Sequence, residues 1–163
     1  MTKITFEQFL ETVDAKNQPF TQDLHHYLLE NGCKVTFEEK KSGLLASYKH
    51  IDKQTKKRQA LLNFVFRKQG LVVRIYGENA YNYLDFLNTL PTEMVQEIAD
   101  ASECKRLMYN ECSPKCAGYD VTIHDNRYQR CRYSGFMFLV TEASAPFIKS
   151  FVENEAIERN KNN

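Results

Sequence analysis

The chain has 163 residues, enough for one domain with a sizeable hydrophobic core. Its 22 lysines and arginines balance 21 aspartates and glutamates, so the net charge of +1 excludes a general electrostatic attraction to nucleic acid or anionic membranes. No apolar run approaches the roughly 18 residues that a membrane-spanning helix needs, which predicts a cytoplasmic protein.

Two helices are predicted at the N-terminus. Thr5 and Gln8 form a capping-box pattern, and apolar residues then recur at helical spacing, which predicts a helix over residues 5–15. A second helix is expected to end at Asn31-Gly32, because both residues tolerate the left-handed conformation. The two helices are expected to pack as a pair.

The period of the apolar residues then changes from about 3.6 to 2, which predicts strands. The joints are short, so each strand is expected to pair antiparallel with the next in a four-stranded meander. The third strand is almost continuously apolar and is expected to be buried on both faces. The predicted strands run from Val35 to the Ser42-Gly43 joint and over residues 44–51, 59–67 and 71–76.

Two more helices, a second small antiparallel unit and a final helix complete the prediction. Pro91 suits the first turn of the second of these helices, which leads to Cys104. A tight turn at Asp125-Asn126 is expected inside the small unit, and residues 159–163 are expected to be a frayed tail. The expected segments are helical residues 80–87 and 91–101, strand residues 119–123, 127–133 and 136–140, and a helix that starts at Ser144 or Ala145.

The sequence therefore predicts an α+β fold in a single domain over residues 1–163. Residues 5–103 would form the helix pair, an antiparallel four-stranded meander and two middle helices. Residues 104–158 would form a small cysteine-bearing C-terminal β unit and the closing helix.

Four of the five cysteines follow the spacing C-x₇-C-x₃-C-x₁₄-C, which offers the four thiolates of a tetrahedral zinc site. A metal would order a loop-like stretch that lacks apolar residues of its own. His124 is a possible substitute ligand. The alternatives are an iron–sulfur cluster and plain buried thiols, which is also the simplest interpretation of Cys33. The predicted zinc ligands are Cys104, Cys112, Cys116 and Cys131.

A redox function is a competing hypothesis for Cys112 and Cys116. The two cysteines flank Pro114 and Lys115, and a nearby cation lowers the pKa of a thiol. The usual exchange motif is C-x-x-C at the start of a helix, however, whereas a strand is predicted to follow this C-x₃-C.

Arginines and tyrosines are interleaved around the cysteines, with a local excess of positive charge. Guanidinium groups and tyrosine rings could meet a small anionic ligand, a protein partner or single-stranded nucleic acid. The ordinary alternative is a solvated face on which arginine stems cover aromatic edges. The candidate ligand surface consists of Arg106, Tyr109, Arg127, Tyr128, Arg130 and Arg132.

No complete catalytic signature is present in the sequence. G-x-S-x-G, P-loop, G-x-G-x-x-G and H-E-x-x-H motifs are all absent. His25 and His26 would point about 100° apart on a helix, so they cannot easily share a metal ion and are interpreted as surface groups.

The segments LLENGCK, NFVFRKQGLVVRIYG, ECSPKC-x-GY and C-R-Y-x₂-F-M-F resemble those of small uncharacterised bacterial proteins of a kind found in anaerobic Gram-positive species. The resemblance covers residues 6–153, but that family has no established activity. In pattern only, the meander followed by helices also resembles the YdhG-like and MmcQ-like small α+β domains. Neither resemblance implies a functional residue.

These observations predict a non-enzymatic cytoplasmic binding module with a structural zinc site and no membrane segment. The alternatives are a thiol-dependent redox enzyme that uses Cys112 and Cys116, and a nucleic-acid-associated or regulatory protein that uses the arginine and tyrosine face.

Overall fold

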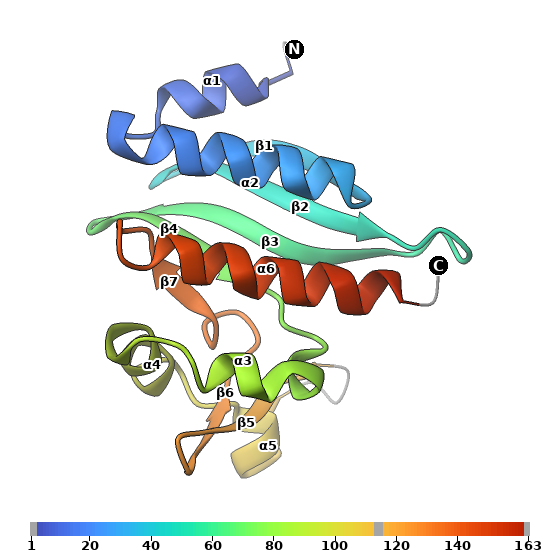
Figure 1. Cartoon of the computed structure of the whole chain (residues 1–163), viewed down its shortest axis with the longest axis vertical. Coiled ribbons are helices and arrows are strands. Elements are labelled where there is room, and N and C mark those ends of the chain that lie inside the picture. The colour runs from blue at the N-terminus through green and yellow to red at the C-terminus, as the bar shows by residue number, and fades with distance from the viewer. Residues whose placement is uncertain (1–2, 113–115, 162–163) are drawn as a thin grey trace.

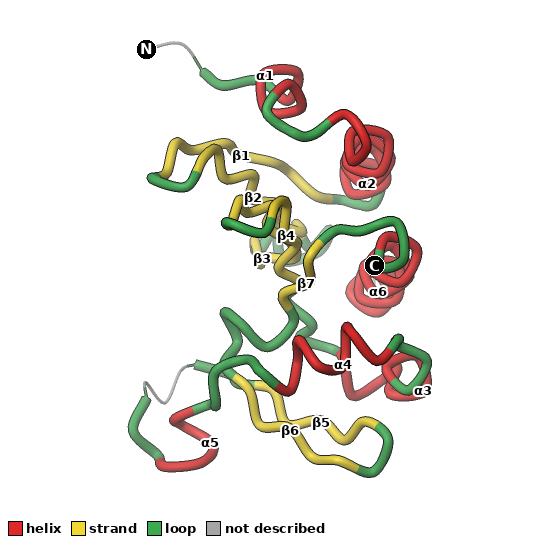
Figure 2. The backbone as a smooth tube through the Cα atoms, turned by 90° about the vertical axis from the view of Figure 1, so that its left-hand side faces the viewer, coloured by secondary structure: helices red, strands yellow, loops and turns green. Residues whose placement is uncertain are grey.

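A computed structural model describes residues 3–112 and 116–161 of the chain. Three helices cover one face of a five-stranded antiparallel sheet, and a smaller unit with a two-stranded hairpin lies at one end of this layer pair (Figures 1 and 2). The predicted α+β class is confirmed.

The first helix begins at its predicted cap. Gln8 N donates to Thr5 Oγ1 at 3.2 Å, and Thr5 N donates to Gln8 Oε1 at 2.8 Å, which completes the predicted capping box. The first helix is shorter than predicted, because the chain turns after Thr12 into a separate 3₁₀ turn. The elements are α1 (Phe6–Glu11), η1 (Ala15–Asn17) and α2 (Gln18–Glu30).

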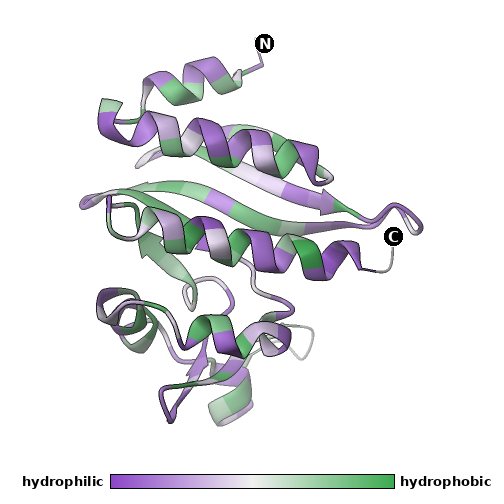
Figure 3. Ribbon diagram, in the orientation of Figure 1, coloured by the Kyte–Doolittle hydropathy of each residue, from purple (hydrophilic) through white to green (hydrophobic). Residues whose placement is uncertain are grey.

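The four strands of the predicted meander are present, and each pairs antiparallel with the next. The third strand is buried continuously from Leu61 to Val65, as its apolar run predicts. In Figure 3, the third strand is largely coloured as hydrophobic between its two ends, whereas the helices carry bands of both kinds. The strands are β1 (Cys33–Lys40), β2 (Gly43–Ile51), β3 (Arg58–Arg67) and β4 (Gly70–Ile75).

The sheet has a fifth strand, which corrects the predicted topology. β7 (Met137–Leu139) was expected in the small C-terminal unit, but it pairs antiparallel with β4, with Phe138 opposite Val73. Phe138 is fully buried in the main core, and its burial accounts for the position of this strand. Pairing with β7 also satisfies the backbone of β4, which would otherwise be an open edge.

The smaller unit contains short helices and one hairpin. The predicted third helix starts as a 3₁₀ turn, and a short helix after Cys104 was not predicted. His124 and Asp125 both have positive φ and form the two-residue turn, one residue earlier than predicted. The elements are η2 (Ala80–Tyr83), α3 (Leu84–Leu87), α4 (Thr92–Ala99), α5 (Lys105–Tyr109), β5 (Tyr119–Ile123) and β6 (Asn126–Arg130).

The final helix, α6 (Ala145–Asn160), crosses the sheet from end to end (Figure 1). Ile148, Phe151 and Val152 form its predicted apolar stripe and are fully buried. The predicted fraying is wrong for Arg159 and Asn160, because the helix continues to Asn160 and the Arg159 side chain is almost completely buried and bonded to the sheet. Residues 162–163 of the predicted tail lie outside the described residues.

The hydrophobic core lies between the helices α1, α2 and α6 and one face of the sheet, and it continues into the smaller unit through Leu87, Met94, Ile98, Val121 and Ile123. Val65 and Val72 are buried but lie outside that core, on the opposite face, which no helix covers in Figure 2. No helix in residues 3–112 and 116–161 is long and apolar enough to cross a membrane.

Candidate functional site

The backbone brings Cys104 and Cys131 together. An isolated antiparallel bridge joins Glu103 to Arg130. On either side of this bridge, Cys104 N donates to the Gln129 carbonyl at 3.0 Å, and Cys131 N donates to the Ser102 carbonyl at 2.8 Å. The first and last of the predicted zinc ligands are therefore on neighbouring backbone segments, although they are far apart in sequence.

Gly118 allows the third segment to approach the same place. A Cβ atom at Gly118 would overlap the sulfur of Cys104, and it would lie 3.3 Å from the carbonyl oxygen of Arg130. Only glycine permits so close an approach. Because Cys116 is two residues before Gly118, this contact brings the C-x₃-C segment next to Cys104 and Cys131.

The pKa of the Cys116 thiol responds to the three other predicted ligands. Burial raises its pKa most, followed by the charge of Cys112, a hydrogen bond with Cys112 and the charges of Cys131 and Cys104. Cys104 is buried, Cys116 and Cys131 are half-buried, and Cys112 is exposed. Cys116 thus lies near Cys112, and Cys104 and Cys131 lie on neighbouring backbone segments. Pro114 and Lys115, invoked in the redox hypothesis, lie outside the described residues.

The thiols are near one another without forming a coordination shell. In the described part of the chain, no three His, Cys, Asp or Glu side chains are grouped so that they could hold a metal ion. His124 is exposed at the tip of the hairpin, and the five-residue strand β6 separates it from Cys131. At ~3.3 Å per residue this separation is roughly 16 Å, too far for a substitute ligand.

Three of the predicted ligand-surface arginines already have strong partners. Arg130 donates from Nε and Nη2 to the carbonyls of Ile98 and Ala99 at 2.9 and 3.0 Å, and so caps the C-terminus of α4. Arg127 is exposed and forms a two-pronged ion pair with Asp120, with distances of 2.9 and 2.6 Å.

The third of these arginines, Arg132, pairs with Glu78 and lies over the Tyr76 ring, 4.9 Å from its centroid. These contacts place its guanidinium against the end of β4. Arg132 thus joins the small unit to the main sheet.

The remaining surface candidates are less engaged. Tyr109 is exposed and donates to Glu103 at 2.9 Å, while Tyr128 lies under Arg130 with 5.3 Å between its centroid and the guanidinium carbon. The Nε atom of Arg106 is shielded from solvent and has no acceptor among the described residues. The six residues surround the hairpin, but three of the four guanidinium groups are committed to internal contacts.

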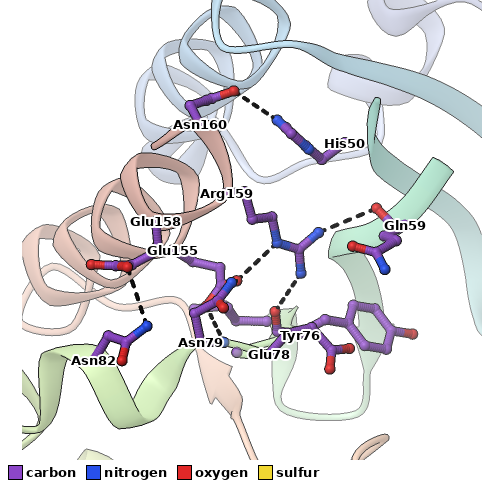
Figure 4. Close-up of polar contacts among 12 residues, drawn as sticks. His50, Gln59, Tyr76, Glu78, Asn79, Asn82, Glu155, Glu158, Arg159 and Asn160 are labelled. Atoms are coloured by element: carbon purple, nitrogen blue, oxygen red, sulfur yellow. Dashed lines mark hydrogen bonds and ion pairs between the residues drawn. The ribbon is translucent and has the colours of Figure 1, made fainter. Parts of the chain in front are cut away.

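A buried ionic network joins α6 to the end of the sheet (Figure 4). Glu155 is fully buried and accepts hydrogen bonds from Tyr83 at 2.5 Å and from Asn79 Nδ2 at 2.8 Å. Arg159 donates to Glu155 at 2.8 Å and to the Tyr76 carbonyl at 2.8 Å. Sequence reasoning missed this network, although the acid and the base are four residues apart in the final helix.

A second polar group lies on the uncovered face of the sheet. Arg74 Nη1 and the Tyr76 hydroxyl both donate to Asn63 Oδ1 at 2.9 Å, and Asn63 Nδ2 donates to Ser47 Oγ at 3.1 Å. The signal for this group was the single polar residue, Asn63, in the apolar run of β3. A buried amide requires polar partners on the neighbouring strands.

No protein-family model matches this chain, and no curated protein or solved structure matches it. The resemblance to small bacterial proteins stays a prediction. The role of the protein must be inferred from the geometry of its own residues.

Proposed function

We infer that this chain is a non-enzymatic binding module in which Cys104, Cys112, Cys116 and Cys131 hold a structural zinc ion. The observation that carries this proposal is the convergence of three separate segments on one thiol neighbourhood, with Gly118 packed against the Cys104 sulfur. Four thiolates are a common ligand set for closed, structural zinc sites.

Few buried apolar contacts stabilise the segment around the thiols. None of the described residues of α5 is buried, and Met108 and Tyr109 are exposed at 39% and 55%. A zinc ion would replace the missing apolar contacts, because its bonds to the Cys112 and Cys116 thiolates would tie this segment to the thiolates of Cys104 and Cys131. Zinc also neutralises thiolates, and so removes the mutual repulsion that helps to raise the pKa of Cys116.

The redox alternative needs the opposite electrostatics. A thiol that attacks a disulfide at neutral pH has a lowered pKa, whereas burial and the neighbouring thiols raise the pKa of Cys116. The nucleic-acid alternative needs free guanidinium groups, and Arg127, Arg130 and Arg132 are already paired. Neither alternative is favoured by a specific contact.

Elemental analysis of the full chain, purified without added zinc, tests the metal site. We expect about one zinc ion per chain, and we expect Cys116→Ser to lose most of it, because three thiolates leave the site open. Cys33→Ala is the matched control, since Cys33 is buried between α2 and the sheet and should leave the zinc content unchanged.

A stoichiometry well below one in the wild type would overturn the zinc site. If the same metal-free protein catalysed thiol–disulfide exchange that Cys116→Ser abolished, the redox enzyme would replace the binding module as the best-supported function.

A further inference from the structure

A pocket of about 350 Å³ lies on the uncovered face of the sheet, beside the turn between β1 and β2. Leu45 and Val65 lie on neighbouring strands and give it an apolar floor. Its volume falls at the lower end of the roughly 300–1,000 Å³ typical of small-molecule sites. None of the predicted ligand residues lines it.

The charge of this pocket is strongly one-sided. Four cationic side chains line it, and no carboxylate does, although the whole chain carries a net charge of only +1. Glu38 pairs with one of them, Lys40, at 3.0 Å, but both side chains are more than half exposed, so water screens this pair. The lining cations are Lys40, Lys41, Arg67 and Arg74.

Arg74 is held in place by neutral acceptors. Its Nε donates to the Tyr133 carbonyl at 2.7 Å, and its Nη1 donates to Asn63 Oδ1 at 2.9 Å. Asn63 is itself fixed by Ser47 and Tyr76. No carboxylate pairs with Arg74 in the described part of the chain, and Nη2 has no partner there. The guanidinium is therefore pre-oriented and keeps an unneutralised charge, as an anion site requires.

We propose that this pocket binds a small amphiphilic anion, with a carboxylate or phosphate group on Arg74 and the lysine and arginine rim, and an apolar body on Leu45 and Val65. This inference rests on the proposed role as a binding module but is independent of the zinc site. An anion without an apolar body would leave the floor unfilled. An apolar molecule without charge would leave Arg74 unpaired.

Calorimetric titration of the full chain with octyl phosphate, below its micellar concentration, tests the pocket. We expect octyl phosphate to bind at least about tenfold more tightly than octanol or inorganic phosphate. Arg74→Gln should weaken binding roughly 10- to 100-fold, the range for losing a charge-assisted hydrogen bond. Arg67→Gln should weaken it several-fold. The Arg67 side chain makes no hydrogen bond or ion pair with the described residues, so this variant guards against misfolding of Arg74→Gln.

Arg127→Gln is the matched control, since Arg127 is exposed on β6 and pairs with Asp120; it should change the affinity less than about twofold. Equal affinity of wild type and both pocket variants would overturn the proposal, and so would the absence of binding.

Sedimentation with phosphatidylglycerol vesicles distinguishes a lipid headgroup from a free molecule as the source of the anion. Capture by vesicles without binding of octyl phosphate would mean a membrane surface and no pocket ligand. A wild-type chain that holds zinc but does not bind octyl phosphate would contradict this inference and leave the metal site standing.

Discussion

At the scale of single residues, His25 is a titratable side chain that is buried in the packing of the fold. Its Nδ1 lies 2.7 Å from the Tyr48 hydroxyl, and its ring stacks on Phe6 with 3.6 Å between centroids. His25 therefore connects α1, α2 and β2. It is buried and its neighbour His26 is exposed, so the interpretation of both as surface groups is wrong for His25.

Acidification should weaken the fold through His25. Burial, followed by the charge of His26, lowers the pKa of His25 from its ordinary value of 6.5, and the charge of Glu7 opposes this shift. The unfolded chain then takes up the proton more readily, so the stabilisation is present above pH 6.5 and is lost as the pH falls through the folded pKa.

We expect the free energy of unfolding, measured by urea denaturation, to fall between about pH 7 and pH 5.5, and to fall less in His25→Gln. His124→Gln is the control, because His124 is exposed on the hairpin turn and its removal should leave the slope unchanged. An identical slope in wild type and His25→Gln would refute the assignment of this pH dependence to His25.

At the scale of elements, the β5–β6 hairpin is anchored along its length, with Val121 buried at its centre and further contacts at its two ends. At the turn, the His124 amide donates to Asn88 at 2.8 Å. At the other end, the Tyr119 ring packs on Phe136, with 4.3 Å between centroids, and its hydroxyl accepts from Gly77 N at 3.0 Å. The thiol neighbourhood lies at this second end, so local packing and the proposed metal site reinforce each other.

Gly118→Ala should disrupt this end of the hairpin. The added methyl group would overlap the Cys104 sulfur, which belongs to a buried side chain with little room to move. We expect a loss of about 1–3 kcal/mol in the free energy of unfolding and a reduced zinc content. Ala117→Ser, at the exposed neighbouring position, should change neither. Full zinc occupancy in Gly118→Ala would show that zinc binding does not depend on the close contact between Gly118 and Cys104.

At the scale of the whole molecule, the network in Figure 4 joins the main sheet, α6 and the small unit. Glu155 contacts Asn79 and Tyr83 of the small unit, and Arg159 reaches the Gln59 and Tyr76 carbonyls of the sheet. The two side chains are 0% and 4% exposed, so they depend on each other and on these partners for their charge. Burial, followed by the charge of Glu155, raises the pKa of Tyr83, which keeps the phenol protonated as a donor.

Glu155→Gln should therefore cost about 3–5 kcal/mol, because it leaves Arg159 buried without a counter-charge. Lys161→Gln, at the C-cap of the same helix, offers the matched control. It breaks the Glu158–Lys161 pair, whose lysine is 58% exposed, and should cost less than about 0.5 kcal/mol. Equilibrium urea unfolding checks both values, and a similar cost for the two variants would show that burial does not matter here.

Several helices and strands could be predicted from local sequence patterns. The capping box of Thr5 and Gln8 and the period-2 alternation around Val35 and Phe37 gave correct elements, because caps and periodicity depend on near neighbours in sequence. The position of β7 could not be read in this way. Its three residues pair with β4 across a long stretch of chain, and only the burial of Phe138 selects that edge.

The residues of the candidate site show the same limit of local sequence patterns. The cysteine spacing predicted a four-thiolate zinc site, which stays a prediction. The arginines beside it were assigned to a ligand surface, but Arg130 caps α4, and Arg127 and Arg132 pair with acids. No local pattern distinguishes a free arginine from one, like Arg130, that meets the end of α4.

By itself, the sequence determined the α+β class and the order of most elements, since composition and spacing carry that information directly. Only the tertiary structure decided that β7 completes the main sheet, that Glu155 and Arg159 are buried together, and that Arg74 faces a cationic pocket. These facts depend on contacts between residues distant in sequence, and such contacts form only when the whole core packs.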